Sequence, residues 1–132
     1  MNSRRKYKVL VFGNALLKND SIQIRLLPEL RAEFPCIEFK ECDPNDNLEN
    51  EGKELNILDC AKGISKVVLL NDIDNIETQK IYGMHDFDLG YSLKLMKKLG
   101  YLDKLNLFCV PTNMHRSTAL KQLKALISAT LC

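Results

Sequence analysis

The sequence lacks a long apolar run, and it carries no marked excess of either charge. Its apolar stretches, such as Lys66–Leu70, are far shorter than the roughly 20 residues that a membrane-spanning helix needs. The 19 Lys and Arg residues nearly balance the 17 Asp and Glu residues, so a generic binder of nucleic acid is not expected. The basic start, Met1–Lys6, precedes too few apolar residues for a secretory signal. We therefore expect a protein of the cytoplasm.

Close cysteine pairs are also missing. The five cysteines are odd in number, form no C-x-x-C motif and mostly lie in apolar segments. A zinc ribbon or a disulfide framework would need paired spacings, so we expect these cysteines to be small core residues in a reducing compartment. They are Cys36, Cys42, Cys60, Cys109 and Cys132.

The composition that remains is that of a globular protein. Hydrophobic residues make up 45% and charged residues 27% of the 132 positions. A chain of this length can bury a core without disulfides or a structural metal, and it corresponds to about one domain. No linker or repeat divides it, so we predict a single domain over residues 1–132.

Five apolar segments predict strands. The first ends at Gly13 and the last at Pro111, two residues that commonly end a strand. The second alternates between apolar and polar residues, which is typical of a strand with one wetter face. The segments are Tyr7–Gly13, Cys36–Cys42, Leu55–Ala61, Lys66–Leu70 and Leu105–Val110.

Three segments have a helical spacing of apolar residues. In 21–34, Pro28 predicts either a kink or two short helices, with the proline opening the second. In 86–99, acidic residues come first and lysines last, with an apolar face that extends to Leu99 and a C-cap at Gly100. Ser117 or Thr118 can cap a last helix. The polar segment 43–53 is expected to be a loop with one helical turn.

The order of these segments predicts an α/β fold. We expect a three-layer sandwich in which helices cover both faces of a mostly parallel, twisted sheet of five strands. The fourth strand follows the third too closely for a helical crossover. It is therefore expected to run antiparallel or to lie at an edge.

Acidic residues and a histidine follow the strands at the ends where such sheets bind ligands. Asp59 is the most telling, because burying a carboxylate is costly unless it is paired, hydrogen-bonded or bound to a metal. Two carboxylates and one imidazole, with positions left open for a substrate, suit a divalent ion such as zinc or nickel. The candidates are Asn14 and Asp20 after the first strand, Asp43 after the second, Asp59 in the third, and His85 after the fourth.

Each candidate also has a purely structural explanation. Asp20 can cap the helix that follows, and Asp43 before Pro44 is common in turns. His85 can be an ordinary residue at the start of a helix, because a single histidine suits many roles. His115 lies in a loop before the last helix, where the sequence indicates no partner for it.

The same segments resemble the hydrogenase maturation endopeptidases. Residues 11–22, VFGNALLKNDSI, are similar to their opening motif, G-x-G-N-x-L-x-x-D-[DE]-x-x-G. Leu55–Ala61 resembles their third strand, which ends in Asp-Ala, and Met84–Gly90 resembles their Ser-x-His-x-x-x-L segment. Leu107–Pro111 is similar to a late strand that runs into a proline. The resemblance extends from about Lys8 to Thr112 in the family's order.

The resemblance implies a specific activity. These enzymes remove a C-terminal extension from the large subunit of nickel–iron hydrogenases after nickel insertion, so the expected partner is that precursor. Asp20, Asp59 and His85 correspond to the family's metal-binding and catalytic residues, and we expect Asn14 and Asp43 to contact the substrate. The metal is a divalent ion, the nickel of the substrate, for which zinc or cadmium can substitute.

The chain departs from the family's pattern in several places. Val11 or Phe12 replaces the first glycine, Asn19 replaces the first aspartate, and Ile24 or a neighbour replaces the last glycine of the opening motif. Asp43–Asp46 (DPND) stands where the family has Asp-Gly-Gly-Thr, and the proline removes the freedom of that turn. The alternative function is therefore a non-catalytic, chaperone-like homologue that binds hydrogenase subunits without cleaving them.

Two other α/β functions fit the sequence poorly. A phosphoacceptor receiver domain needs a pair of acids after strand one and a lysine after strand five, where this chain has Gly13-Asn14 and Thr112. A dinucleotide-binding fold needs further glycines close behind Gly13, and these are missing.

Overall fold

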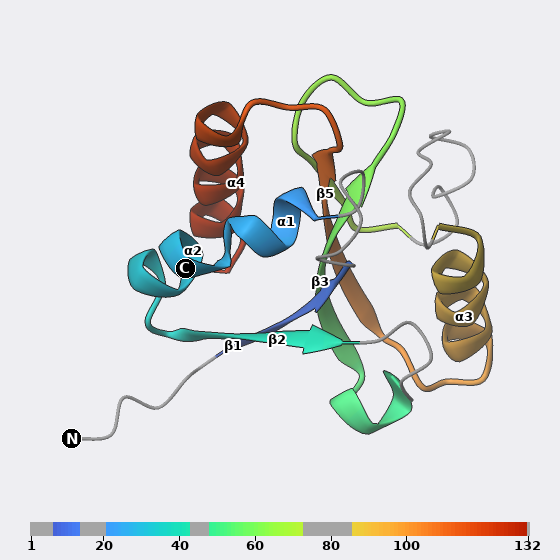
Figure 1. The fold of residues 1–132 in the computed structure, drawn as a ribbon. Coiled ribbons are helices and arrows are strands. Elements are labelled where there is room, and N and C mark those ends of the chain that lie inside the picture. Colours follow the sequence, from blue (N-terminus) through green and yellow to red (C-terminus); the bar gives the residue numbers. More distant parts are fainter. Residues whose placement is uncertain (1–6, 14–20, 43–47, 73–85, 132) are drawn as a thin grey trace.

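The computed structural model describes residues 7–13, 21–42, 48–72 and 86–131, with only the backbone for 86–91. These residues form five strands and five helical segments (Figure 1). In chain order they are β1 (Tyr7–Phe12), α1 (Ile22–Arg25), α2 (Leu27–Glu33), β2 (Ile37–Cys42), the 3-10 helix η2 (Leu48–Glu51), β3 (Glu54–Ala61), β4 (Val68–Leu70), α3 (Asp86–Lys98), β5 (Lys104–Pro111) and α4 (Arg116–Thr130).

The strands form one mixed sheet in the order β2-β1-β3-β5-β4. The pairs β1–β2, β1–β3 and β3–β5 are parallel, so the carboxyl ends of four strands lie at the same edge of the sheet. Strand β4 pairs antiparallel with β5 and forms one outer edge. Both expectations for the fourth strand are therefore confirmed, because the short connection after β3 leaves no room for a crossover helix.

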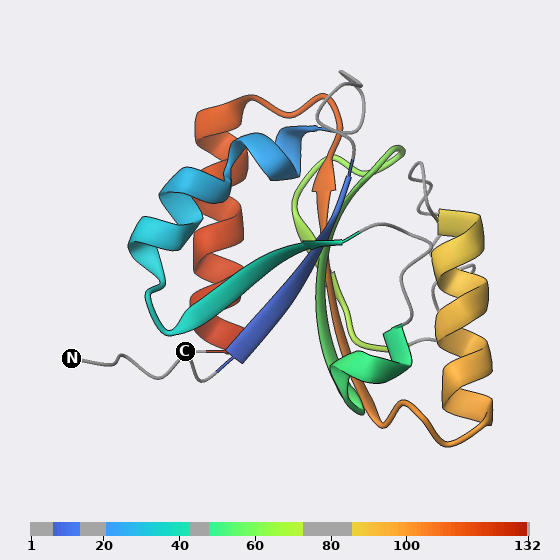
Figure 2. The ribbon, with the colours of Figure 1, turned by 60° about the horizontal axis from the view of Figure 1, so that its bottom comes forward.

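Helices cover both faces of this sheet, as predicted for a three-layer α/β sandwich (Figure 2). Helices α1, α2 and α4 lie on one face, where Val9, Leu58 and Phe108 form a core with the helix residues Leu30 and Ile127. Helix α3 and η2 lie on the other face. Their buried residues pack with those of the strands there: Leu10, Phe12, Leu48, Ile57, Leu93, Met96 and Leu107.

The helical segment around Pro28 consists of two short helices. Helix α1 ends at Arg25, and α2 begins at Leu27 with Pro28 in its first turn, where the missing N–H costs no helical hydrogen bond. Ser21 occupies the N-cap position of α1, but its side chain makes no capping hydrogen bond. The prediction of two short helices, with Pro28 at the start of the second, is confirmed.

Two helix ends differ from the sequence-based expectation. The N-cap of α4 is His115, whose side chain accepts a hydrogen bond from the backbone N–H of Ser117, so neither Ser117 nor Thr118 is the cap. Leu99 is 56% exposed, because α3 has already ended. There Gly100 adopts φ +82°, and the N–H of Tyr101 donates to the carbonyl of Met96.

Three of the cysteines are core residues, as expected. Cys42, Cys60 and Cys109 are buried among the apolar side chains of the sheet, and Cys36 is partly buried. None of these four residues forms a disulfide. Within the described part of the chain, no helix has the length and apolar character needed to cross a membrane.

Glu51 joins η2 to two strands near the amino end of β3. Its carboxylate forms ion pairs with Lys8 of β1 and with Lys40 of β2, the latter at 2.8 Å. The Lys40 ammonium, followed by that of Lys8, lowers the pKa of Glu51 by hydrogen bonding. The same contact raises the pKa of Lys40.

Because the pKa of Glu51 is lowered on folding, its ion pairs stabilise the protein above about pH 4.5, and this contribution is lost as the pH falls through the lower, folded pKa. We expect Glu51→Gln to lower the free energy of unfolding at neutral pH by about 1 kcal/mol or less. Urea unfolding at neutral pH and near pH 3 measures this difference, which should shrink in acid. Glu54→Gln is the control, because Glu54 is 69% exposed and lies 3.7 Å from Lys104. Equal losses at both pH values for Glu51→Gln would contradict the prediction.

Candidate functional site

Asp59 lies near the carboxyl end of β3, two residues before the strand ends at Ala61. It pairs in register with Cys109 of β5 and is only 2% exposed. Side chains alternate along a strand, so Asp59 shares a face with Ile57 and Ala61, which belong to the core on the α3 side. The sequence-based prediction of a buried carboxylate at this edge of the sheet is confirmed for Asp59.

Amide groups hold the carboxylate of Asp59. Its Oδ1 accepts a hydrogen bond of 2.8 Å from the backbone N–H of Cys60 and a longer one of 3.5 Å from Nε2 of Gln23. These donors offset part of the cost of removing a carboxylate from water. Both donors are amide groups, one from β3 itself and one from α1.

Gln23 is a buried polar residue that the sequence analysis missed. It lies in α1, is 0% exposed, and donates from Nε2 to the carbonyl of Phe12, the last residue of β1, at 2.6 Å. A sequence signal was present, since Gln23 stands three and four positions before Leu26 and Leu27 and so shares their buried side of the helical segment. Burial of a polar residue in an apolar stripe points to a specific partner.

The other predicted site residues are not placed. Asn14, Asp20, Asp43 and His85 all lie outside the described residues. Among the residues that the structure does describe, no three His, Cys, Asp or Glu side chains form a group that could hold a metal ion. A site that joins Asp59 to Asp20 and His85 therefore stays a prediction.

The backbone is nevertheless consistent with the predicted order of the site. Strand β1 ends at Phe12 and β2 at Cys42, the residue before Asp43, and both are parallel to β3. Helix α3 begins at Asp86, the residue after His85. Strands β1 and β2 thus end, and helix α3 begins, next to positions that the sequence assigns to the site.

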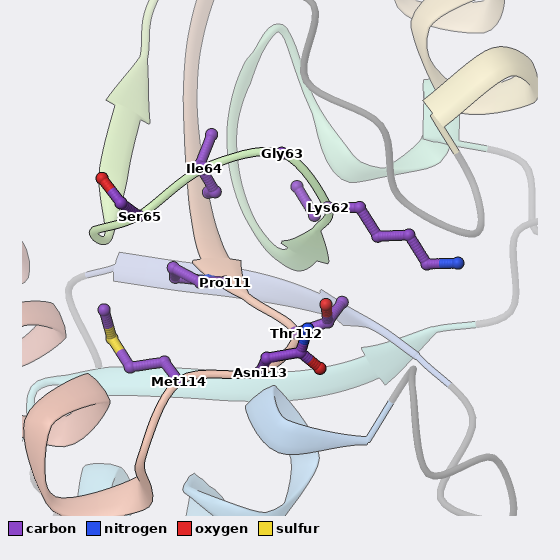
Figure 3. A pocket seen from close by; sticks show the side chains of 9 residues that line it. Lys62, Gly63, Ile64, Ser65, Pro111, Thr112, Asn113 and Met114 are labelled. Carbon is purple, nitrogen blue, oxygen red and sulfur yellow. The ribbon is translucent and has the colours of Figure 1, made fainter.

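A pocket of about 530 Å³ opens beyond the carboxyl ends of β3 and β5 (Figure 3). The segments that follow the two strands line it, and they are joined by a hydrogen bond of 3.2 Å from the N–H of Thr112 to the carbonyl of Ala61. Its walls combine one lysine with neutral polar and apolar side chains. The lining residues are Ala61, Lys62, Gly63, Ile64, Ser65, Pro111, Thr112, Asn113 and Met114.

Neither the family models nor the curated proteins contain a match to this chain. Solved structures do match over nearly its whole length. The hydrogenase maturating endopeptidase HybD from E. coli aligns with a TM-score of 0.65 at 18% identity, covering 96% of this chain and 94% of that one. The chain has the HybD fold.

Two further structures support that conclusion. An endopeptidase from Escherichia coli aligns with a TM-score of 0.58 at 18% identity, covering 93% of this chain and 94% of that one. An uncharacterized protein from Wolinella succinogenes aligns with a TM-score of 0.58 at 17% identity, with coverages of 94% and 98%. The α/β sandwich of the HybD fold is thus shared despite low sequence identity.

The hydrogen bonds of Asp59 predict how substitutions there affect stability. Asp59→Asn keeps a side-chain oxygen that can accept from the N–H of Cys60, whereas Asp59→Leu offers no acceptor. We expect the leucine variant to be less stable than the asparagine variant by about 1–3 kcal/mol, the cost of a lost buried hydrogen bond. Chemical denaturation of both purified variants measures the difference. Equal stability would mean that the hydrogen bonds to Asp59 contribute nothing to folding.

Proposed function

We propose that this chain is a hydrogenase maturation endopeptidase, which removes a C-terminal extension from the precursor of a nickel–iron hydrogenase large subunit. The observation that carries the proposal is the buried carboxylate of Asp59 near the carboxyl end of β3, in a chain with the HybD fold. In the hydrogenase maturation endopeptidases, which the sequence resembles, an aspartate at the end of the third strand is one of the metal-binding residues.

In this proposal Asp59 acts with Asp20 and His85 on the nickel ion already present in the substrate. The chemistry of Asp59 fits that role, because a carboxylate oxygen is a suitable ligand and both hydrogen bonds described above go to Oδ1. Binding through Oδ2 would leave these hydrogen bonds intact. The nickel serves to identify a precursor that is ready for processing.

The pocket beyond β3 and β5 offers room for the precursor's polypeptide beside the same edge of the sheet. Its volume of about 530 Å³ lies in the range of pockets that bind ligands. Its walls suit a peptide. Ser65 and Thr112 can hydrogen-bond to the backbone of a bound peptide, and Ile64 and Met114 can pack against its apolar side chains. We therefore assign the pocket to the substrate chain.

Incubation of the purified protein with a nickel-loaded precursor tests the activity directly. We expect a product of lower mass by intact mass spectrometry, and we expect Asp59→Asn and His85→Ala to slow its formation more than about 100-fold, since each loses a contact with the metal. A nickel-free precursor should not be cleaved. Processing by either variant at the parent rate would contradict the site assignment.

The alternative function predicts a different result in the same experiment. A non-catalytic homologue would co-elute with the nickel-loaded precursor without any loss of mass. The sequence observation that favours it is the replacement of a glycine-rich turn by Asp43-Pro44. Stable co-elution with an unchanged precursor would thus replace the endopeptidase proposal by a binding function.

The role of the pocket is tested by narrowing it. Asn113 is exposed at its wall, so Asn113→Trp should fill part of the pocket with little effect on folding. We expect KM for the precursor to rise about 10-fold or more, because the bulky ring excludes part of the substrate. Lys121→Trp, on the exposed side of α4, is the control and should leave KM unchanged. An unchanged KM for Asn113→Trp would remove the pocket from the substrate path.

A further inference from the structure

Gln23 is a fully buried polar side chain in a helix of four residues. Ile22 and Leu26 of the same segment are core residues. Burying an amide in such surroundings costs free energy unless hydrogen bonds replace its contacts with water. The location of those hydrogen bonds therefore indicates why glutamine occupies this position.

The side-chain amide of Gln23 joins two strands at their carboxyl ends. Its Nε2 carries two hydrogens, so it can donate to two acceptors at once. One acceptor is the carbonyl of Phe12 at 2.6 Å, and the other is Oδ1 of Asp59 at 3.5 Å. The short hydrogen bond fixes the nitrogen at the end of β1, and the longer contact reaches the carboxylate in β3.

The hydrogen bond from Cys60 reaches the same oxygen of Asp59. With the N–H of Cys60 at 2.8 Å and Nε2 of Gln23 at 3.5 Å, Oδ1 has one donor from its own strand and one from α1. Two donors from different directions limit rotation of the carboxylate about its χ2 bond. The second oxygen of the carboxylate is thereby given a defined direction.

We propose that Gln23 is a positioning residue, which orients the carboxylate of Asp59 so that its second oxygen can bind a divalent cation. The inference rests on the proposed function, since it assumes that Asp59 binds the metal. Partners of this kind, which hold a ligand without touching the metal, commonly change metal affinity 10- to 100-fold when they are removed.

The amide of Gln23 also distinguishes this chain from the motif that it resembles. Counting from Gly13 and Asn14, the last glycine of that motif falls on Gln23. A glycine has no side chain that could reach Asp59. The contact between Gln23 and Asp59 therefore belongs to this chain and is not inherited from the motif.

Gln23→Met tests the proposal, because methionine is close to glutamine in length and flexibility but has no N–H donor. We expect the dissociation constant for Zn²⁺, measured by calorimetry on the purified full chain, to rise about 10-fold. We also expect a changed visible spectrum for bound Co²⁺, since the orientation of a ligand affects that spectrum.

Gln122→Met is the matched control. Gln122 of α4 accepts a hydrogen bond of 2.9 Å from the N–H of Val67, so its replacement also removes a contact between a glutamine side chain and another segment. We expect this variant to lose stability without any change in Zn²⁺ affinity. A loss of affinity in Gln23→Met alone would therefore reflect positioning and not general destabilisation.

The possible outcomes separate this inference from the proposed function. If the unaltered chain binds Zn²⁺ and Gln23→Met binds it equally well with the same Co²⁺ spectrum, the positioning role is wrong and the proposed function is unaffected. If Gln122→Met weakens binding as much as Gln23→Met, the positioning role is also wrong. If the unaltered chain binds neither Zn²⁺ nor Co²⁺, the metal-binding part of the proposed function fails together with the inference.

Discussion

The parallel pairing of β2, β1, β3 and β5 is the constraint on which the candidate site depends. Four strands that run in the same direction bring their carboxyl ends to one edge, so loops that are distant in sequence begin close together. Parallel strands need crossover connections, and these carry α1 and α2 on one face and α3 on the other, while α4, which follows β5, covers the same face as α1 and α2. The position of Asp59 thus follows from the topology as much as from its own strand.

The two ends of the sheet carry acidic groups in different ways. Near the amino end of β3, Glu51 is paired with the ammonium groups of Lys8 and Lys40, which balance its charge and lower its pKa. Towards the carboxyl end, Asp59 receives hydrogen bonds from the neutral amides of Cys60 and Gln23. Glu51 is thus held by ion pairs between neighbouring elements, whereas the hydrogen bonds described above for Asp59 come from amide groups of β3 and α1.

Most of the fold could be predicted because its signals are local. Apolar runs mark all five strands, Pro28 marks the start of α2, and the short connection before β4 determines its antiparallel direction. Helix ends were less predictable, since the sequence offers Ser117 or Thr118 as the N-cap of α4, whereas the folded backbone places His115 there. The sequence located the C-cap near Gly100, but the helical period extended the apolar face to Leu99, which is exposed because α3 ends at Lys98.

The candidate site was predictable only in part, and the reason is physical. The buried carboxylate of Asp59 could be inferred from its apolar neighbours in β3, because the sequence alone shows that an acid there needs a partner. The partner Gln23 could not be inferred in the same way, since 36 residues separate it from Asp59 and only the packing of α1 near the end of β1 brings the two together.

The structure also changes how the departures from the family's motif are interpreted. From the sequence, the missing final glycine of the opening motif is a loss that favours a non-catalytic homologue. In the structure, the glutamine at that position donates to the end of β1 and to the acid of the candidate site, so the substitution adds a contact there. The departure at Gln23 therefore does not by itself favour the non-catalytic alternative.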